Sequence, residues 1–129
     1  MKQAFEIRNQ VFVIEQNVDR DIEYDEYENG SVHILATLNH ESVATARWRS
    51  TEKGIKLERF AVLKKARGLR VGEALVQFCL THVDLSKTIY LHAQERVMPF
   101  YAKLGFQKCG ERFIEANIPH FLMKYHSDI

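Results

Sequence analysis

The chain has 129 residues and a formal net charge of +1 at pH 7, with 46% hydrophobic and 27% charged residues. These proportions are typical of one soluble globular domain spanning residues 1–129, and no apolar run approaches the roughly 18 residues of a membrane span. Basic residues form no stripe interleaved with aromatic ones, so we expect neither a membrane nor a nucleic acid as partner.

The spacing of cysteines and histidines argues against a secreted protein built on disulfides and against a metal-binding protein. The two cysteines, Cys79 and Cys109, form no C-x-x-C pair, and the polar N-terminus lacks the apolar core of a signal peptide. A reducing, cytoplasmic setting is therefore expected, with Cys79 serving in packing. The six histidines show neither H-x-x-x-H nor H-x-H spacing, so no metal site is expected.

Hydrophobic periodicity predicts elements in the order α, β, β, β, α, β, α, β, β. They are a helix over 2–14, a loop to about residue 30, strands over 31–38, 42–49 and 55–62, a helix over 68–82, a strand over 88–93, a short helix near Pro99 that Gly105 ends, and strands over 107–115 and 119–125.

Acidic residues concentrate near the start of the chain. Residues 1–30 hold eight acidic and three basic residues, and the acidic run lies between Asp19 and Glu28. Such a run is either a solvated loop or the border of a site that accepts a cation, and both interpretations stay open here.

The stretch over residues 57–75, LERFAVLKKARGLRVGEAL, combines a strand, a basic turn and a helix. A helix begins with unpaired N–H groups and a positive dipole end, so basic residues just before it favour a phosphate or pyrophosphate site. A capped surface helix is the alternative. The stretch contains neither G-x-x-x-x-G-K-[ST] nor G-x-G-x-x-G, which argues against a nucleoside-triphosphate loop and a dinucleotide fold.

This turn resembles the Q/R-x-x-G-x-G/A acetyl-CoA signature of the GNAT superfamily of N-acetyltransferases. The matching residues are Arg67, Gly68, Leu69, Arg70, Val71 and Gly72. Arg70 stands where the family usually has glycine. Its side chain could crowd the pyrophosphate, or it could point away and add a charge to the site.

Two further stretches strengthen the resemblance. The segment from His92 to Phe106 is similar to the late strand of the family and to its F-Y-x-K-x-G-F helix. Residues 7–16, IRNQVFVIEQ, together with Ile118-Pro119-His120, are similar to the ElaA-like (YjcF-like) branch. The resemblance covers nearly the whole chain and implies an α+β GNAT fold. Its central mixed, mostly antiparallel sheet would be flanked by helices, and the first strand of the family would be absent.

The resemblance implies an enzyme that transfers acetyl from acetyl-CoA, used as co-substrate, to a primary amine by direct attack in a ternary complex. A small molecule or a peptide could supply the amine, and a homodimer is compatible with the fold. A non-catalytic sensor that binds acyl-CoA is the alternative, favoured by Arg70 and by the absent strand.

Two residues are candidates for catalysis. Glu58 lies on the strand before the cofactor loop and would be the base; strict alternation places it on one face with Phe60 and Val62. The alternative is that Glu58 pairs with a neighbouring arginine such as Arg47 or Arg49. Tyr101 matches the family tyrosine that protonates the departing thiolate, and a packing role is its alternative.

The remaining candidates follow from the resemblance. The pyrophosphate would bind the turn from Arg67 to Gly72. The pantetheine arm would pair with the strand residues Phe60, Ala61 and Val62. Two residues of the short helix, Phe100 and Lys103, complete the expected cofactor site. The acceptor would meet residues from the N-terminal element, the acidic run, the late strand and the I-P-H element, namely Glu15, Asp25, His92, Gln94 and His120. For His120 two alternatives stay open, a secondary base and a core or surface histidine without a catalytic role.

Overall fold

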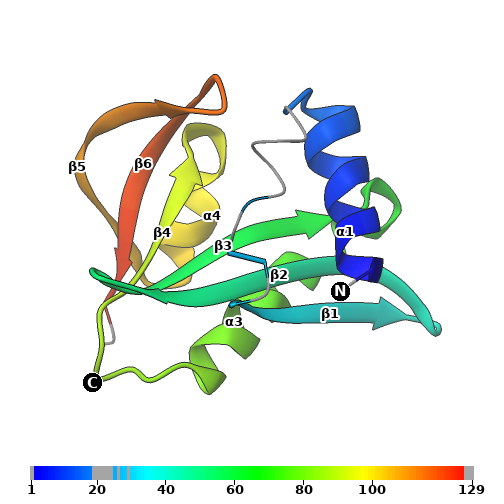
Figure 1. Ribbon diagram of the computed structural model, residues 1–129, viewed down its shortest axis with the longest axis horizontal. Helices are drawn as coiled ribbons and strands as arrows, with labels where there is room; N and C mark the ends of the chain where they lie inside the picture. Colours follow the sequence, from blue (N-terminus) through cyan, green and yellow to red (C-terminus); the bar gives the residue numbers. More distant parts are fainter. Residues whose placement is uncertain (1, 19–24, 26, 29, 127–129) are drawn as a thin grey trace.

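The computed structural model describes residues 2–18, 25, 27–28 and 30–126, and one mixed sheet organises them (Figure 1). Its elements are α1 (Lys2–Arg8), the π-helix η1 (Asn9–Glu15), β1 (Val32–Leu38), β2 (Glu41–Thr51), β3 (Gly54–Val62), the 3-10 turn η2 (Lys64–Ala66), α3 (Val71–His82), β4 (Ile89–Gln94), the 3-10 turn η3 (Glu95–Val97), α4 (Met98–Lys103), β5 (Phe106–Glu115) and β6 (Ile118–Tyr125). The predicted α+β order is confirmed. In this part of the chain no helix is long and apolar enough to cross a membrane.

The sheet divides into two halves that meet only briefly. Within the described residues its six strands follow the order β1-β2-β3-β4-β6-β5. Only β3 and β4 run parallel, and they pair at just two positions, Ile55 with Ile89 and Lys56 with Tyr90. Beyond these pairs the two strands diverge (Figure 1), so the backbone groups of β3 that face β4 have no strand partner there.

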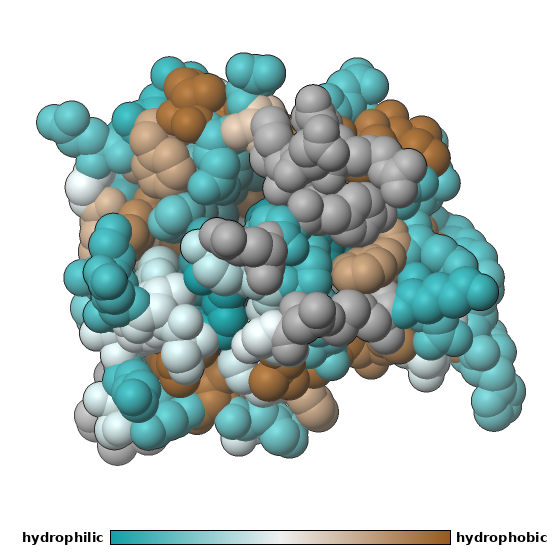
Figure 2. Space-filling model, viewed as in Figure 1, coloured by the Kyte–Doolittle hydropathy of each residue, from teal (hydrophilic) through white to brown (hydrophobic). Residues whose placement is uncertain are grey.

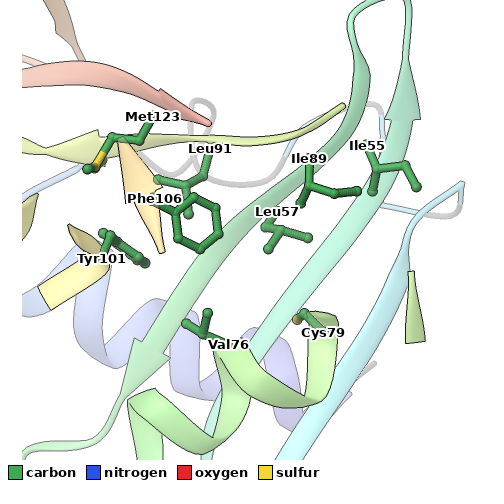
Figure 3. Packing of buried hydrophobic residues seen from close by; sticks show 10 residues of the cluster. Ile55, Leu57, Val76, Cys79, Ile89, Leu91, Tyr101, Phe106 and Met123 are labelled. Carbon is green, nitrogen blue, oxygen red and sulfur yellow. The ribbon is translucent and has the colours of Figure 1, made fainter. Parts of the chain in front are cut away.

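Helices cover both faces of the first half of the sheet. Ile7 and Val11 pack on Ala61 on one face, whereas Val71 and Leu75 of α3 pack within a separate apolar cluster on the other. The main core lies between α3, α4 and the strands, and its buried members are Ile55, Leu57, Val76, Cys79, Ile89, Leu91, Ala93, Tyr101, Phe106 and Met123. Figure 3 shows Tyr101 at one end of this cluster, next to Phe106.

Cys79 is fully buried in this core, which confirms the packing role predicted for it. Burial raises the pKa of its thiol to about 12, so the side chain stays a neutral, unreactive thiol at physiological pH.

The first helix changes its winding midway. The predicted helix over 2–14 is present, but residues 9–15 form a π-helix, as the hydrogen bond from the Gln16 N–H to the Val11 carbonyl (3.2 Å) shows. A π-helix is rare in proteins, and those that do occur are frequently found at functional sites. Here it ends at Glu15 and Gln16, which bond to Arg67 and Gln94 respectively.

A bulge in β3 changes which residues share a face. Pairing with β2 shifts by one residue at Arg59, whose φ of 59° is left-handed. Leu57 and Phe60 therefore both face the main core, while Ala61 faces the first helix. The prediction that Glu58 shares a face with Phe60 and Val62 is wrong, because strict alternation stops at this bulge.

Candidate functional site

A cavity of about 580 Å³ lies where β3 and β4 separate. Residues from β3, β4, β6, α4 and the loops line it together. The predicted site residues that it brings together are Asp25, Glu58, Phe60, Val62, Arg67, Gly72, His92, Gln94, Phe100, Tyr101 and His120. Figure 2 shows hydrophilic residues at the centre of the face seen in Figure 1 and along its left and right margins, with hydrophobic patches at the top and bottom.

Other predicted site residues lie outside the lining. Ala61 and Val71 are buried in apolar clusters. Four further predicted residues are exposed and do not line the cavity, namely Gly68, Leu69, Arg70 and Lys103. Glu15 contributes indirectly, because its carboxylate bonds to Arg67 Nη2 at 3.0 Å while Arg67 Nε donates to the Val62 carbonyl.

The start of α3 forms one end of the cavity. Its first intrahelical hydrogen bond runs from the Ala74 N–H to the Arg70 carbonyl (3.1 Å), so the N–H groups of residues 71–73 lack an intrahelical acceptor. With the helix dipole and Arg67 close by, this end is suited to an anion. A Cβ at Gly72 would lie 3.5 Å from the Phe100 ring, on the cavity side of the helix.

Arg70 adopts a left-handed conformation, with φ of 63° and ψ of 22°. Glycine adopts this conformation without steric cost, which accounts physically for the glycine that the family signature has at this position. Arg70 is exposed and is not among the residues that line the cavity, so in this structure its side chain does not fill the cavity beside α3.

Tyr101 faces the cavity from α4. Its ring packs against Phe60, Phe100 and Phe106 at centroid distances of 6.1, 5.1 and 5.9 Å. No described residue exchanges a hydrogen bond with its hydroxyl. Burial, and to a smaller extent nearby Cys79, raises the pKa of Tyr101 above its usual range, so the hydroxyl keeps its proton.

Glu58 is held by cations. Its carboxylate accepts hydrogen bonds from Arg47 Nε (2.6 Å) and Arg49 Nε (2.9 Å) and lies 3.2 Å from Lys56 Nζ. Burial alone would raise the pKa of this carboxyl, but the surrounding cations, Lys56 first among them, lower it to about 2. The pairing with Arg47 and Arg49 is thus present, and a carboxylate with such a pKa accepts protons weakly.

Two members of the acidic run turn inward. Asp25 pairs with Arg47 at 2.7 Å, and Glu28 forms two 2.8 Å bonds to the fully buried Arg8. For these two residues the solvated interpretation is wrong, because buried arginines draw them in; Asp25 also borders the cavity. The remaining acids of the run, at positions 19, 21, 23 and 26, lie outside the described residues.

Glu115 is a cavity residue that the sequence analysis missed. It lies 3.2 Å from His92 Nδ1 and 3.6 Å from His120 Nε2. A two-residue turn, Ala116-Asn117, brings Glu115 opposite Ile118 and near His120. The sequence contains no clear signal for this turn, because two-residue turns between strands usually carry Asn-Gly or Asp-Gly, whereas this one carries Ala-Asn.

Comparisons with known proteins identify the family to which the chain belongs. Residues 3–127 match the family described as "Acetyltransferase (GNAT) domain". The chain is 39% identical to the Bacillus subtilis "Uncharacterized N-acetyltransferase YjcF", covering 95% of this chain and 90% of that protein. It is 35% identical to Escherichia coli "Protein ElaA", covering 92% and 82%.

Solved structures share the fold. The crystal structure of Escherichia coli ElaA superposes with a TM-score of 0.86 at 31% identity, covering 97% of this chain and 88% of that one. An aminoglycoside 6'-N-acetyltransferase complexed with coenzyme A superposes with a TM-score of 0.73 at 18% identity, covering 94% and 88%. The second likeness concerns the fold alone.

Proposed function

Because the chain belongs to the GNAT family of acetyltransferases, we propose that it transfers acetyl from acetyl-CoA to a primary amine within a ternary complex. The predicted resemblance to the ElaA-like branch is confirmed by the relatives YjcF and ElaA. The chain is accordingly an acyltransferase, and the proposal concerns its acceptor and its mechanism.

One observation carries the proposal: the cavity follows the divergence of β3 from β4 and ends at the start of α3. The pantetheine arm of acetyl-CoA would pair with the backbone of residues 60–62, which has no strand partner toward β4. The pyrophosphate would bind the free N–H groups at residues 71–73, with Arg67 beside them. A protein of the same fold, an aminoglycoside 6'-N-acetyltransferase, is complexed with coenzyme A, which supports coenzyme A as the kind of ligand.

The rest of the lining suits an acceptor. Tyr101 keeps its proton at neutral pH and is proposed as the acid that protonates the departing thiolate. Beyond it, carboxylates and histidines meet at the end of the cavity formed by the β5–β6 turn. An amine is positively charged at neutral pH and would be attracted to these carboxylates.

The first test is thermal unfolding with and without acetyl-CoA. At about 100 times its dissociation constant, a ligand adds about 2.7 kcal/mol of stability, which for a domain of this size is a rise of several degrees. We expect that rise with acetyl-CoA and a much smaller one with ATP, a control that supplies phosphates without a pantetheine arm. Equal responses to both would contradict the proposed cofactor site.

A substitution of Gly72 by aspartate tests the pyrophosphate placement. We expect an unfolding free energy within about 1 kcal/mol of the original, because a Cβ makes ordinary contacts here and an acidic residue is favourable in the first turn of a helix. Affinity for coenzyme A should fall at least tenfold, because the added carboxylate would repel the pyrophosphate at the start of α3. Calorimetric titration measures both proteins, and unchanged affinity would move the pyrophosphate elsewhere.

A further inference from the structure

The ring nitrogens of His120 have distinct roles fixed by their neighbours. Nδ1 lies 2.6 Å from the Ile118 carbonyl oxygen. A carbonyl can only accept a hydrogen bond, so Nδ1 must carry the proton of the neutral imidazole. The lone pair therefore resides on Nε2, and His120 lines the cavity with this nitrogen directed toward Glu115 at 3.6 Å.

The orientation of this ring is fixed by packing. Phe113 stacks on His120 at a centroid distance of 5.8 Å and an interplanar angle of 22°. Pro119 restricts the backbone just before the ring, and the side chain is buried, with 6% of the residue exposed. The proton-accepting nitrogen thus has a defined position before any ligand binds.

Glu115 lies between two histidines at the same end of the cavity. It contacts His92 at 3.2 Å on one side and faces His120 on the other. The hydrogen bond with His92 lowers the pKa of Glu115, against the opposing effect of burial, so the group is a carboxylate at neutral pH. With 40% of its side chain exposed, it remains accessible to a ligand.

The turn that places Glu115 is under strain. Ala116 and Asn117 have φ values of 51° and 63°, a conformation that costs alanine energy. Ala116 itself lines the cavity. Strain of this kind is frequent at functional sites, because surrounding structure must hold it in place.

From this arrangement we propose that His120 is the base that deprotonates the acceptor amine and that Glu115 binds the amine beside it. The inference rests on the proposed acetyl transfer and names the residues that perform its first step. It replaces Glu58 in that role, because cations already occupy the Glu58 carboxylate.

The step balances as follows in atoms and charges. The bound ammonium loses one proton to His120 Nε2, and the neutral amine attacks the thioester carbonyl carbon. The C–N bond forms, the C–S bond breaks, and the thiolate takes the proton of Tyr101. The nitrogen loses its second proton to the tyrosinate as the amide forms, and His120 then releases its proton to solvent.

Several charged groups face this base. Glu115 from β5 lies 3.6 Å from His120 Nε2 and 3.2 Å from Nδ1 of His92 on β4. Lys56 and Glu58 from β3 line the same cavity.

The kinetic test measures kcat/KM against pH with acetyl-CoA and a primary-amine panel of methylamine, ethanolamine, spermidine and glycinamide. His120→Asn keeps a donor for the Ile118 carbonyl but has no basic nitrogen; we expect about a hundredfold loss and disappearance of the acid limb. Glu115→Gln should raise KM for the amine about tenfold while kcat stays within about threefold of the original, because Glu115 binds the amine and does not take its proton. His82→Asn, on the exposed face of α3 and outside the cavity, is the matched control and should behave as the original.

Two results would overturn the inference. One is a His120→Asn protein that keeps its limb and at least a third of its rate, while Glu58→Gln flattens the limb. The other result requires no acceptor. It would be a histidine 15N spectrum of the original protein in which the neutral His120 ring carries its proton on Nε2 and not on Nδ1. If acetyl-CoA binds but the original protein acetylates no amine of the panel, the proposed function fails for these acceptors, and the tautomer alone then decides on His120.

Discussion

Replacing Arg47 with leucine is expected to lower the free energy of unfolding by about 3–5 kcal/mol. The Arg47 side chain is completely buried, and its guanidinium contacts Asp25, Glu28 and Glu58. These carboxylates come from the segment before β1 and from β3. Leucine would leave them without their shared cation, and removal of one partner from a buried ion-pair network is costly because the remaining charges stay poorly solvated.

Urea unfolding at pH 7 measures this loss. The matched control is Arg112→Leu, because Arg112 pairs with Glu95 at 3.1 Å while about half of each side chain is exposed. Exposed pairs contribute about 0–1 kcal/mol, so the control should remain near the original stability. If the two variants lost equal stability, the buried network would have no special role in the fold.

The same network predicts acid sensitivity. Burial opposes ionisation of both groups, yet the cations hold the pKa of Asp25 and of Glu58 at about 2, below the ordinary values of 3.8 and 4.5. Between about pH 4.5 and pH 2 the unfolded chain therefore binds more protons than the folded one, so stability falls as the pH falls through this window. In Arg47→Leu the pKa of both carboxyls should move up, and stability should depend less on pH there. A slope equal to that of the original protein would exclude Arg47 as the cause.

The sequence predicted the regular elements well because their signals are local. Alternation along 42–49, the spacing of apolar residues in 68–82 and the basic turn between them each depend on near neighbours. The same reasoning placed Gly72 and Arg67 at the start of a helix. The cavity lies there because α3 follows β3, which diverges from β4 after two paired positions, and the periodicity of apolar residues does not indicate that divergence.

The features that were not predicted depend on backbone strain or on distant partners. Arginine at position 59 gives no signal for a left-handed bulge, yet that bulge decides the face on which Glu58 lies. Arg8 and Glu28 are separated by 20 positions, and their pairing follows only from the packing of α1 on the sheet. Glu115 meets His120 through a turn that lacks glycine. Strict periodicity cannot reveal such contacts, because each depends on a local departure from regular structure or on the packing of segments that are distant in the sequence.

Replacing Tyr101 with phenylalanine should lower kcat at least tenfold while leaving the affinity for acetyl-CoA within about twofold. Phenylalanine keeps the ring contacts with Phe60, Phe100 and Phe106, so only the hydroxyl is removed. That hydroxyl has no partner among the described residues and stays protonated, so it is available to protonate the departing thiolate. The residue thus combines a packing ring with a group that the packing does not use.

Single-turnover release of the thiol is the measurement for this prediction, because steady-state kcat would conceal the effect if product release were slow. Tyr90→Phe is the matched control: its ring is also buried, but its hydroxyl bonds to Thr51 at 2.6 Å and lies outside the cavity lining. This control should lose about 1 kcal/mol of stability and no turnover. If Tyr101→Phe retained the original single-turnover rate, the thiolate would leave without help from this residue, and Tyr101 would serve the enzyme through its ring alone.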